Sequence, residues 1–337
     1  MSRRLPVESK PIRYSISKPE APIEGHALTR YLIGAGGWAY FQVPRVHPLV
    51  AYSKAFDFVE VNSTFYKIPN LRLVESWRRL VPPKFEFTVR CNKALTHKHK
   101  FQPVREAFEV MQKMITICRI LEAEILHVQT PPTFKPINRN TETLRNFFSS
   151  IDLKGIRIAL EVRGGKQPIN PYLGKTMQDQ GMIHCVDLSK DEKPAYQSDV
   201  LYSRLFGKGS HNIYQPTDQE LKKIDRKASR GGHKTVAVSF HFVRMYKDAT
   251  RYKIYKQTGK FPMVTKSTGL RSLKEVLEED ATFPSSKEKL IRHQGWKLID
   301  VAKTRRVHAS RMLERLPEKT YNSVNEVLQT LGSIKPR

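Results

Sequence analysis

Acidic, basic, amide and imidazole side chains recur along the middle of the chain, each at the end of a short apolar run. They are Glu60 and Asn62, Lys93 and His97, Gln129, Glu161 and Arg163, Asp187, Arg204, and His241. Carboxylates of this kind can ligate a metal or act as a base, and the cations can hold a phosphate. Because buried charge is costly unless it is paired or used, the set predicts a functional site. The alternative is mutual ion pairing that only caps the fold, for example between Glu161 and Arg204.

The apolar runs themselves indicate the elements that would position these residues. Eight runs rich in β-branched and aromatic residues predict strands at 31–33, 58–61, 85–91, 125–129, 158–162, 183–187, 201–205 and 235–242. Segments with helical spacing, such as 104–121, lie between them. Eight strand–helix repeats predict an α/β fold, a (β/α)8 TIM-type barrel, in which the strand ends converge at one mouth. A doubly wound open sheet is the alternative, but no G-x-G-x-x-G fingerprint follows the first strand.

Beyond about residue 259 the pattern changes to helical spacing alone. Ser285-x-x-Glu288 and Ser323-x-x-Glu326 have the spacing of capping boxes and predict two helix starts. We therefore expect a basic, proline-rich arm over 1–29, the barrel over 30–259, and a small α-helical C-terminal appendage over 260–337.

The charge of the chain points to a class of partner. Its 59 Lys and Arg against 32 Asp and Glu give a net charge of +27. Such an excess attracts polyanions, of which nucleic acid is the commonest in cells; solubility in a salt-rich cytoplasm is the alternative. No apolar stretch approaches the roughly 20 residues of a membrane span, and no secretory leader is recognisable. The three cysteines form no C-x-x-C pair, so we expect a soluble cytoplasmic protein without membrane partners.

Several motifs resemble those of one barrel family. They are Ile33-Gly34-x-x-Gly37-Trp38, residues 59–66 (VEVNSTFY), Thr96-His97, residues 129–134 (QTPPTF), Glu161-x-Arg163, Asp187, Arg204-Leu205-x-Gly207 and Tyr214. Over about 31–252 the chain resembles the YecE-like family, also called domain of unknown function 72 (DUF72), which implies a barrel and no particular reaction. The end of the chain, at 283–288 (FPSSKE) and 316–323 (LPEKTYNS), resembles the small helical domain of unknown function 2795.

Two departures from the family pattern bear on function. The family follows Glu-x-Arg with a histidine and an aromatic residue, where this chain has Gly164-Gly165-Lys166. It has paired asparagines after the eighth strand, where this chain has Phe240-His241-Phe242. Functions that need those groups are in question here.

These residues lead to specific role assignments. We predict catalytic roles for Glu60, Glu161, Asp187 and Lys93. A divalent metal ion (Mg, Mn or Zn) is predicted on Glu60, His97, Glu161 and Asp187. Substrate binding is predicted for Trp38, Asn62, Tyr66, Gln129, Arg163, Arg204, Tyr214 and His241. In a metal-free alternative, Glu161 or Asp187 is the general base and the cations stabilise the developing charge. The run 97–100 (HKHK) is also typical of an exposed loop, in which His97 binds no metal.

The predicted function is a nucleic-acid-processing barrel. It would be a metal-assisted endonuclease or DNA-repair-type phosphodiester hydrolase acting on single-stranded or damaged nucleic acid, with DNA favoured over RNA and RNA as the alternative. At fold level only, this resembles barrel nucleases such as endonuclease IV, whose sites are richer in histidine. Aromatic residues after the first two strands are placed to stack on unpaired bases: Trp38, Tyr40, Phe41, Phe65 and Tyr66, with Phe65 expected in the core. The alternatives are a sugar or sugar-phosphate barrel enzyme and a non-catalytic nucleic-acid-binding protein.

Overall fold

The computed structural model of the chain describes residues 29–163, 168–190 and 192–334. The basic arm predicted over 1–29 lies outside the described residues except for Thr29, and so do Gly164, Gly165 and Lys166. No helix within the described ranges is long and apolar enough to cross a membrane.

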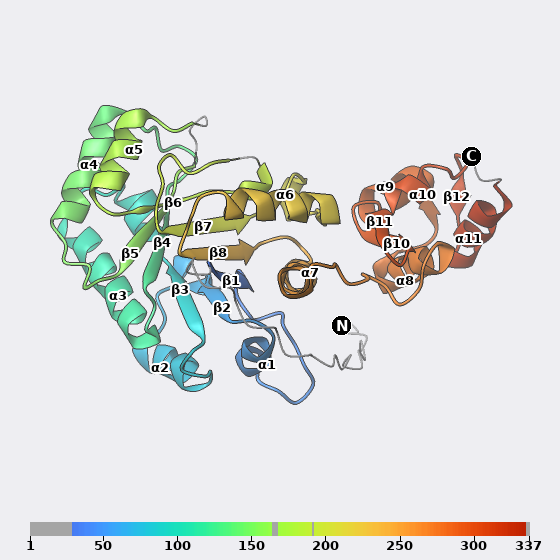
Figure 1. Cartoon of the computed structure of the whole chain (residues 1–337), viewed down its shortest axis with the longest axis horizontal. Coiled ribbons are helices and arrows are strands. Elements are labelled where there is room, and N and C mark those ends of the chain that lie inside the picture. Colours follow the sequence, from blue (N-terminus) through green and yellow to red (C-terminus); the bar gives the residue numbers. More distant parts are fainter. Residues whose placement is uncertain (1–28, 164–167, 191, 335–337) are drawn as a thin grey trace.

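Eight parallel strands form the centre of the molecule, with helices around them (Figure 1). They are β1 (Arg30–Ala35), β2 (Phe58–Val61), β3 (Glu86–Arg90), β4 (Ile125–Gln129), β5 (Arg157–Glu161), β6 (Ile183–Cys185), β7 (Val200–Leu205) and β8 (Thr235–Phe240). Hydrogen bonds join them into two sheets, in the orders β1-β8-β7 and β2-β3-β4-β5-β6. The eight predicted strands and the TIM-type α/β fold are confirmed.

The two sheets meet at two seams that close the barrel. At the first, between β6 and β7, a single parallel bridge joins Val186 to Ser203. At the second, between β1 and β2, the hydroxyl of Tyr52 links the two strands in place of a ladder of backbone hydrogen bonds. It accepts a hydrogen bond from the Ala35 N–H at 2.7 Å and donates one to the carbonyl of Phe58 at 3.0 Å. Gly34 permits this approach, because a Cβ there would lie 2.1 Å from the Phe58 carbonyl oxygen.

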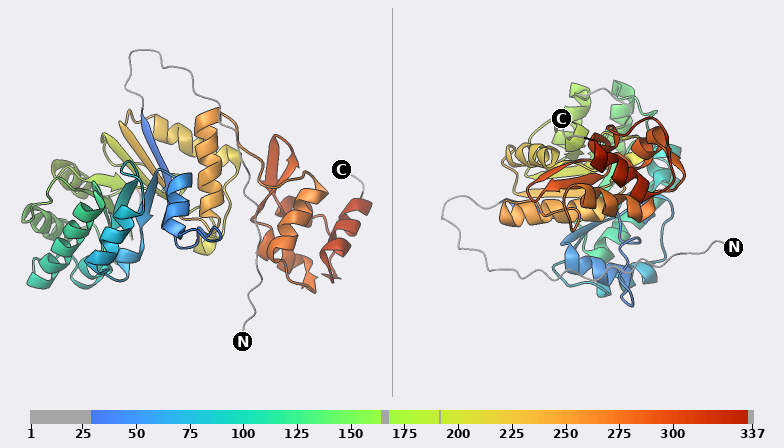
Figure 2. Two further views of the ribbon diagram at one scale, coloured as in Figure 1. Left: turned by 90° about the horizontal axis from the view of Figure 1, so that it is seen from below. Right: turned by 90° about the vertical axis from the view of Figure 1, so that its right-hand side faces the viewer.

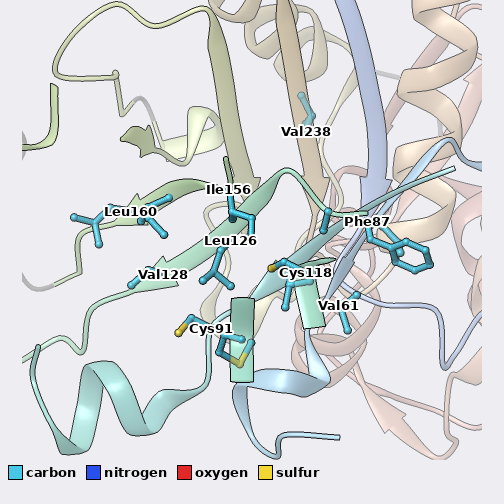
Figure 3. Close-up of a cluster of buried hydrophobic side chains, with 14 of the residues drawn as sticks. Val61, Phe87, Cys91, Cys118, Leu126, Val128, Ile156, Leu160 and Val238 are labelled. Atoms are coloured by element: carbon cyan, nitrogen blue, oxygen red, sulfur yellow. The ribbon is translucent and has the colours of Figure 1, made fainter. Parts of the chain in front are cut away.

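Helices cover the outside of the strands. They are α1 (Pro48–Ala55), α2 (Leu71–Arg79), α3 (Arg105–Leu121), α4 (Asn138–Ser149), α5 (Pro171–Asp179), α6 (Asp218–Ser229) and α7 (Met245–Thr258). Figure 3 shows outward side chains of the strands, among them Leu126 and Val128, in one apolar cluster with Cys118 of α3. In the described part of the β6–β7 connection there is one 3-10 turn, Leu188–Lys190, where the repeat predicted a helix. The carboxylate of Asp187 accepts the Ser189 N–H at 2.9 Å and folds the chain into this turn.

The barrel interior is divided along its axis. Near the amino ends of the strands it is apolar, filled by Leu32, Phe58, Ile125, Ala159, Ile183, Tyr202 and Ala237, with Cys185 at the border of the polar half. Two residues further along several of these strands, the buried side chains are polar: Glu60, His127, Arg204 and Ser239. Since side chains of a strand alternate between its faces, residues two apart both point inward. The apolar half is therefore a packed plug, and the polar half lies toward the mouth.

The C-terminal segment forms a lobe beside α6 and α7 (Figures 1 and 2). Its elements are α8 (Leu270–Asp280), β9 (Ser285–Ser286), α9 (Lys287–Gln294), β10 (Leu298–Ala302), β11 (Arg305–His308), α10 (Ser310–Leu313), β12 (Thr320–Tyr321) and α11 (Val324–Ser333). The prediction of helices alone was wrong, because β10 and β11 form an antiparallel hairpin and β9 pairs with β12. The β-branched residues Ile299, Val301 and Val307 beside a short polar turn were the signal for that hairpin. The helix start predicted at Ser323 is confirmed, since Ser323 caps α11, whereas α9 is capped by Ser286, one residue after the predicted Ser285, which lies in β9.

A chain of alternating buried charges joins the lobe to the barrel. Asp218, at the start of α6, accepts hydrogen bonds from Arg251 of α7 at 2.7 Å and from Arg306 of β11 at 2.6 Å. Arg251 also donates to Asp248 at 2.9 Å, and Arg306 lies 2.9 Å from Asp300. The lobe is thus held by largely buried ion pairs, which solvent screens less than pairs on the surface.

The first prediction concerns Asp248 in this chain. Burial raises the pKa of Asp248 to about 6, although Arg251 opposes the rise, and its Oδ2 has no hydrogen-bond partner in the described structure. Because the unfolded pKa is near 3.8, the folded protein binds an extra proton between about pH 4 and pH 6, and stability falls as pH rises through that window. Asp248→Asn removes the titrating carboxyl and with it this loss of stability at higher pH. In urea denaturation, its free energy of unfolding relative to wild type should rise by roughly 3 kcal/mol between pH 4 and pH 7.

The control is Asp179→Asn, which changes an exposed carboxylate of α5. It should follow the wild type across the same pH range. A constant difference between Asp248→Asn and wild type would contradict the prediction.

Candidate functional site

The guanidinium of Arg204, on β7, is the centre of the polar half of the barrel. Its Nε and Nη2 donate to the two carboxylate oxygens of Glu60, on β2, at 2.9 Å each. Its Nη1 donates to Glu161, on β5, at 2.5 Å. Arg204 is only 2% exposed. One side chain therefore ties together three strands that come from both sheets, and the ion pair between Glu161 and Arg204 named above as the alternative is confirmed.

Glu161 is fully occupied by donors. Its Oε1 accepts hydrogen bonds from Gln129 at 2.6 Å and from Arg163 at 2.8 Å, and its Oε2 lies 3.1 Å from the Nε2 of His127. Burial would raise the pKa of Glu161, but Arg204 and these neighbours outweigh it and hold the pKa well below its ordinary value. Glu161 thus stays ionised with its lone pairs in use. His127 was missed from the sequence because it lies inside β4 rather than at its end.

Glu60 is held in the same way. Besides Arg204, it accepts a hydrogen bond from the Tyr202 hydroxyl at 2.9 Å and lies 3.6 Å from the His241 Nε2. Burial would raise the pKa of Glu60, but Arg204 and then His241 hold it well below the ordinary value. His241 is therefore part of the same network. Its own pKa is lowered, by burial first and then by Arg204.

A second arginine organises the neighbouring polar residues. Arg90, on β3, donates to the Asn62 side chain at 2.6 Å and to the Gln129 side chain. Its Cζ lies 3.7 Å from the centre of the Phe65 ring. Asn62 and Gln129, both predicted to bind substrate, are thus oriented by Arg90.

A cleft of about 430 Å³ opens beside this network. Its lining includes Glu161, Arg163, Asp187, Lys190, Glu192, Arg204 and Phe206. Three cations surround the Phe206 ring: the Cζ of Arg204 at 4.9 Å, the Cζ of Arg163 at 5.3 Å and the Nζ of Lys190 at 5.7 Å from its centre. The ring also stacks on His241 at 4.7 Å. The cleft therefore presents three cations around an aromatic ring, with the carboxylates of Glu161, Asp187 and Glu192 beside them.

Asp187 lines the cleft but does not join the carboxylates of Glu60 and Glu161. Its oxygens accept the N–H groups of Ser189 at 2.9 Å and Phe206 at 3.1 Å, and its own N–H donates to Glu192 at 2.7 Å. β6 ends at Cys185, so the following turn directs Asp187 to the loops. Burial raises the pKa of both Asp187 and Glu192.

Lys93, Tyr66 and His97 lie at the rim rather than in the network. The Lys93 Nζ is 6.0 Å from the centre of the Tyr66 ring, and Tyr66 is 66% exposed. His97 contacts Thr96 through its Nδ1 at 2.7 Å, and its ring packs edge-on against Phe65. Phe65 is only 8% exposed, which confirms the expectation that it is a core residue.

Trp38 and Tyr214, both predicted to bind substrate, make structural contacts. Trp38 packs edge-on against Trp77 of α2, with ring centres 5.2 Å apart. The Tyr214 hydroxyl donates to Glu220 at 2.7 Å, and its ring lies 5.2 Å from that of His308 in the lobe. Trp38 therefore helps to fix the loop after β1, and Tyr214 helps to seat the lobe.

One group of side chains within the described ranges has ligand atoms close enough to hold a metal: His127, Glu161 and Cys185, all within 4.8 Å of one another. Of the four predicted ligands, only Glu161 belongs to it; the structure does not bring Glu60, His97 and Asp187 to the same point. Burial raises the pKa of the Cys185 thiol well above its ordinary value, and Glu161 is already neutralised by Arg204. Because a metal needs the thiolate and would lie beside a guanidinium, these side chains fit a divalent ion poorly.

The loops that follow the strands at the mouth are basic. We call residues 36–47, 62–70, 91–104, 130–137, 162–163, 168–170 and 206–217 the mouth loops. They carry Arg45, Lys67, Lys93, Lys98, Lys100, Lys135, Arg163 and Lys208, and no aspartate or glutamate. The loop after β6, which also lies at the mouth, adds Lys190 and Lys193 together with Asp187 and Glu192. The loops at the opposite end of the barrel mix both signs, for example Asp57, Glu122 and Asp152 with Lys84 and Lys154. Positive charge is therefore concentrated at the mouth.

Comparisons with known proteins agree with this architecture. The family model described as "Protein of unknown function DUF72" matches residues 32–253. The UPF0759 protein YunF of Bacillus subtilis is 28% identical over 146 residues, which are 41% of this chain and 51% of YunF, so the chain spans about half of that relative. A solved DUF72 family protein from Thermotoga maritima has a TM-score of 0.57 at 19% identity, over 68% of this chain and 99% of that one. Another, from Enterococcus faecalis, has a TM-score of 0.53 at 17% identity, over 69% and 99%. These two structures show a shared fold.

The second prediction compares two arginines that share Glu161. Arg204→Met leaves two buried carboxylates without their main partner and should lower the free energy of unfolding at pH 7 by about 3 to 5 kcal/mol. Arg163→Met, whose side chain is 41% exposed, should cost less than about 1 kcal/mol. Urea denaturation measures both.

The pH dependence provides a further check. The low pKa values of Glu60 and Glu161 stabilise the wild type above about pH 4.5, and this stabilisation is lost as pH falls and the carboxylates protonate. The cost of Arg204→Met should therefore shrink below that pH, and adding Glu60→Gln to it should recover stability at pH 7. Equal costs for the two arginine variants would refute the assigned role of Arg204.

Proposed function

The chain belongs to the DUF72 family, and we propose that it binds nucleic acid across the mouth of its barrel, with one backbone phosphate in the cleft beside Phe206. The observation that carries the proposal is the excess of positive charge at the mouth, where the lysines and arginines of the mouth loops outnumber the carboxylates of the loop after β6, such as Asp187 and Glu192. A positive surface of this kind attracts the phosphate backbone whatever its sequence.

The cleft has the features of a phosphate site. Arg163 and Lys190 are 41% and 49% exposed, so both can reach an incoming anion. Arg204 lies beneath them and contributes its charge without leaving Glu60 and Glu161. Arginine suits a phosphate because its planar fork of donors matches two phosphate oxygens.

The spread of the cations favours a polymer over a small anion. Basic residues occur in the loops after β1, β2, β3, β4, β5 and β7. A small anion would contact only those nearest the cleft. A strand of nucleic acid can engage several of them at once, releasing counterions at each contact.

Hydrolysis of the bound phosphodiester is a second candidate function, and the carboxylates of Asp187 and Glu192 in the cleft lining favour it. Glu192 would take a proton from the attacking water, in place of Glu60 and Glu161, whose oxygens are occupied by Arg204, and of Asp187, whose oxygens accept the N–H groups of Ser189 and Phe206. Arg163, Lys190 and Arg204 would neutralise the developing charge, a role that a metal plays in other phosphodiesterases. Cleavage of a labelled oligonucleotide should then persist in the presence of a chelator.

The third prediction tests where binding occurs. Wild-type affinity for a fluorescent single-stranded oligonucleotide should fall steeply with salt, by about 0.7 log units per log unit of salt for each phosphate contact. Lys93→Ala with Lys98→Ala, at the mouth, should reduce that slope by about 1.4. Fluorescence anisotropy over a series of salt concentrations measures it.

The matched control is Lys84→Ala with Lys234→Ala, which removes the same charge from the opposite end of the barrel. Its slope should stay near that of the wild type. A wild-type affinity that does not change with salt would refute nucleic-acid binding. Equal effects of the two double variants on the salt slope would refute binding at the mouth.

A further inference from the structure

We infer that the strand bound at the mouth is single-stranded and that its unpaired bases stack on Tyr40 and Tyr66. The inference rests on the proposed function and narrows its substrate class. Tyr40 and Tyr66 are 82% and 66% exposed, although each follows a strand of the barrel within one short loop. Large aromatic surfaces left open to water at one rim are typical of a contact surface.

Tyr40 is held in place by its neighbour. The Phe41 ring packs edge-on against Tyr52, Phe56 and Tyr246, with centre distances of 5.6, 5.9 and 5.1 Å. This contact anchors the loop after β1 in the core, while the adjacent Tyr40 side chain remains 82% exposed. The exposure of Tyr40 is therefore built into an ordered loop.

Tyr66 repeats the same arrangement in the loop after β2. Phe65 is the buried member of the pair, with Arg90 stacked on its ring at 3.7 Å, and Tyr66 packs edge-on against it at 5.1 Å. Lys93 approaches the Tyr66 ring at 6.0 Å. In both loops a phenylalanine fixes the backbone and the adjacent tyrosine is left available.

The two loops belong to one surface. They follow β1 and β2, which meet at the seam closed by Tyr52. The contact between Trp38 and Trp77 ties the first loop to α2, the helix that comes directly after the second. Arg45 lies on the first loop and Lys67 on the second, and neither loop has a carboxylate.

The charges beside Tyr40 and Tyr66 indicate which kind of partner binds there. Cations beside exposed aromatic rings favour a polyanion with flat bases over a second copy of this basic chain. In a duplex the faces of the bases are covered by their neighbours, so the rings can stack only on unpaired or extruded bases. A single strand satisfies both the tyrosines and the basic mouth loops.

The test uses the full chain with Tyr40→Ala and Tyr66→Ala together. Binding of a labelled oligothymidine should weaken by about tenfold or more, because each lost stacking contact removes affinity, while a duplex of equal length should change by less than about threefold. Tyr40→Phe with Tyr66→Phe keeps both rings and should bind like the wild type. Leu73→Ala, which truncates an exposed apolar side chain of α2, is a further control and should change neither affinity.

Three results would overturn the inference. The first is an unchanged ratio of single-strand to duplex affinity in the alanine variant. The second is an equal loss of affinity for inorganic polyphosphate, which has charges and no bases. The third is a loss of thermal stability in the alanine variant that the phenylalanine variant does not share, since it would show a packing role. The proposed function is unaffected by any of these results if the wild type still binds the single strand and the duplex with an affinity that falls as salt rises.

Discussion

Arg204 is buried between the carboxylates of Glu60 and Glu161, and the polar half of the barrel depends on these ion pairs. Removing a guanidinium from water costs several kcal/mol, and only partners with good geometry offset that cost. Here the partners come from β2 and β5, so the same contacts that neutralise the charge also cross the barrel. Tyr202 and His127 then contact these carboxylates, and the network has little freedom to rearrange.

Because these contacts fix the polar side chains of the barrel interior, the groups that can bind a ligand lie outside it, in the cleft and the mouth loops. Glu60 and Glu161 are ionised but occupied, so neither can readily bind a metal or take a proton from a substrate. The groups that remain accessible are Arg163 and Lys190 in the cleft and the basic residues of the mouth loops. These accessible groups are better suited to binding phosphates than to holding a metal ion.

The sequence predicts the fold well because apolar strand runs and helical spacing are local signals. It also predicts that Glu161 and Arg204 converge, since both lie at the ends of parallel strands of one barrel. The surroundings of each strand end are set by long-range packing, and the sequence did not indicate the turn at Leu188–Lys190 that Asp187 begins. His127 could have been predicted from the alternation of side chains along a strand, because it lies two residues before Gln129 on β4 and so on the same face. The role of Phe206 depends on cations from three separate segments, and no spacing in the sequence indicates it.

Hydrogen–deuterium exchange with and without a single-stranded oligonucleotide tests the central claim, that the mouth of the barrel is the nucleic-acid surface. The account predicts slower exchange in the mouth loops, above all 91–104 and 206–217, and unchanged exchange in the loops at the opposite end of the barrel. Protection confined to that opposite end, or to the C-terminal lobe, would contradict it.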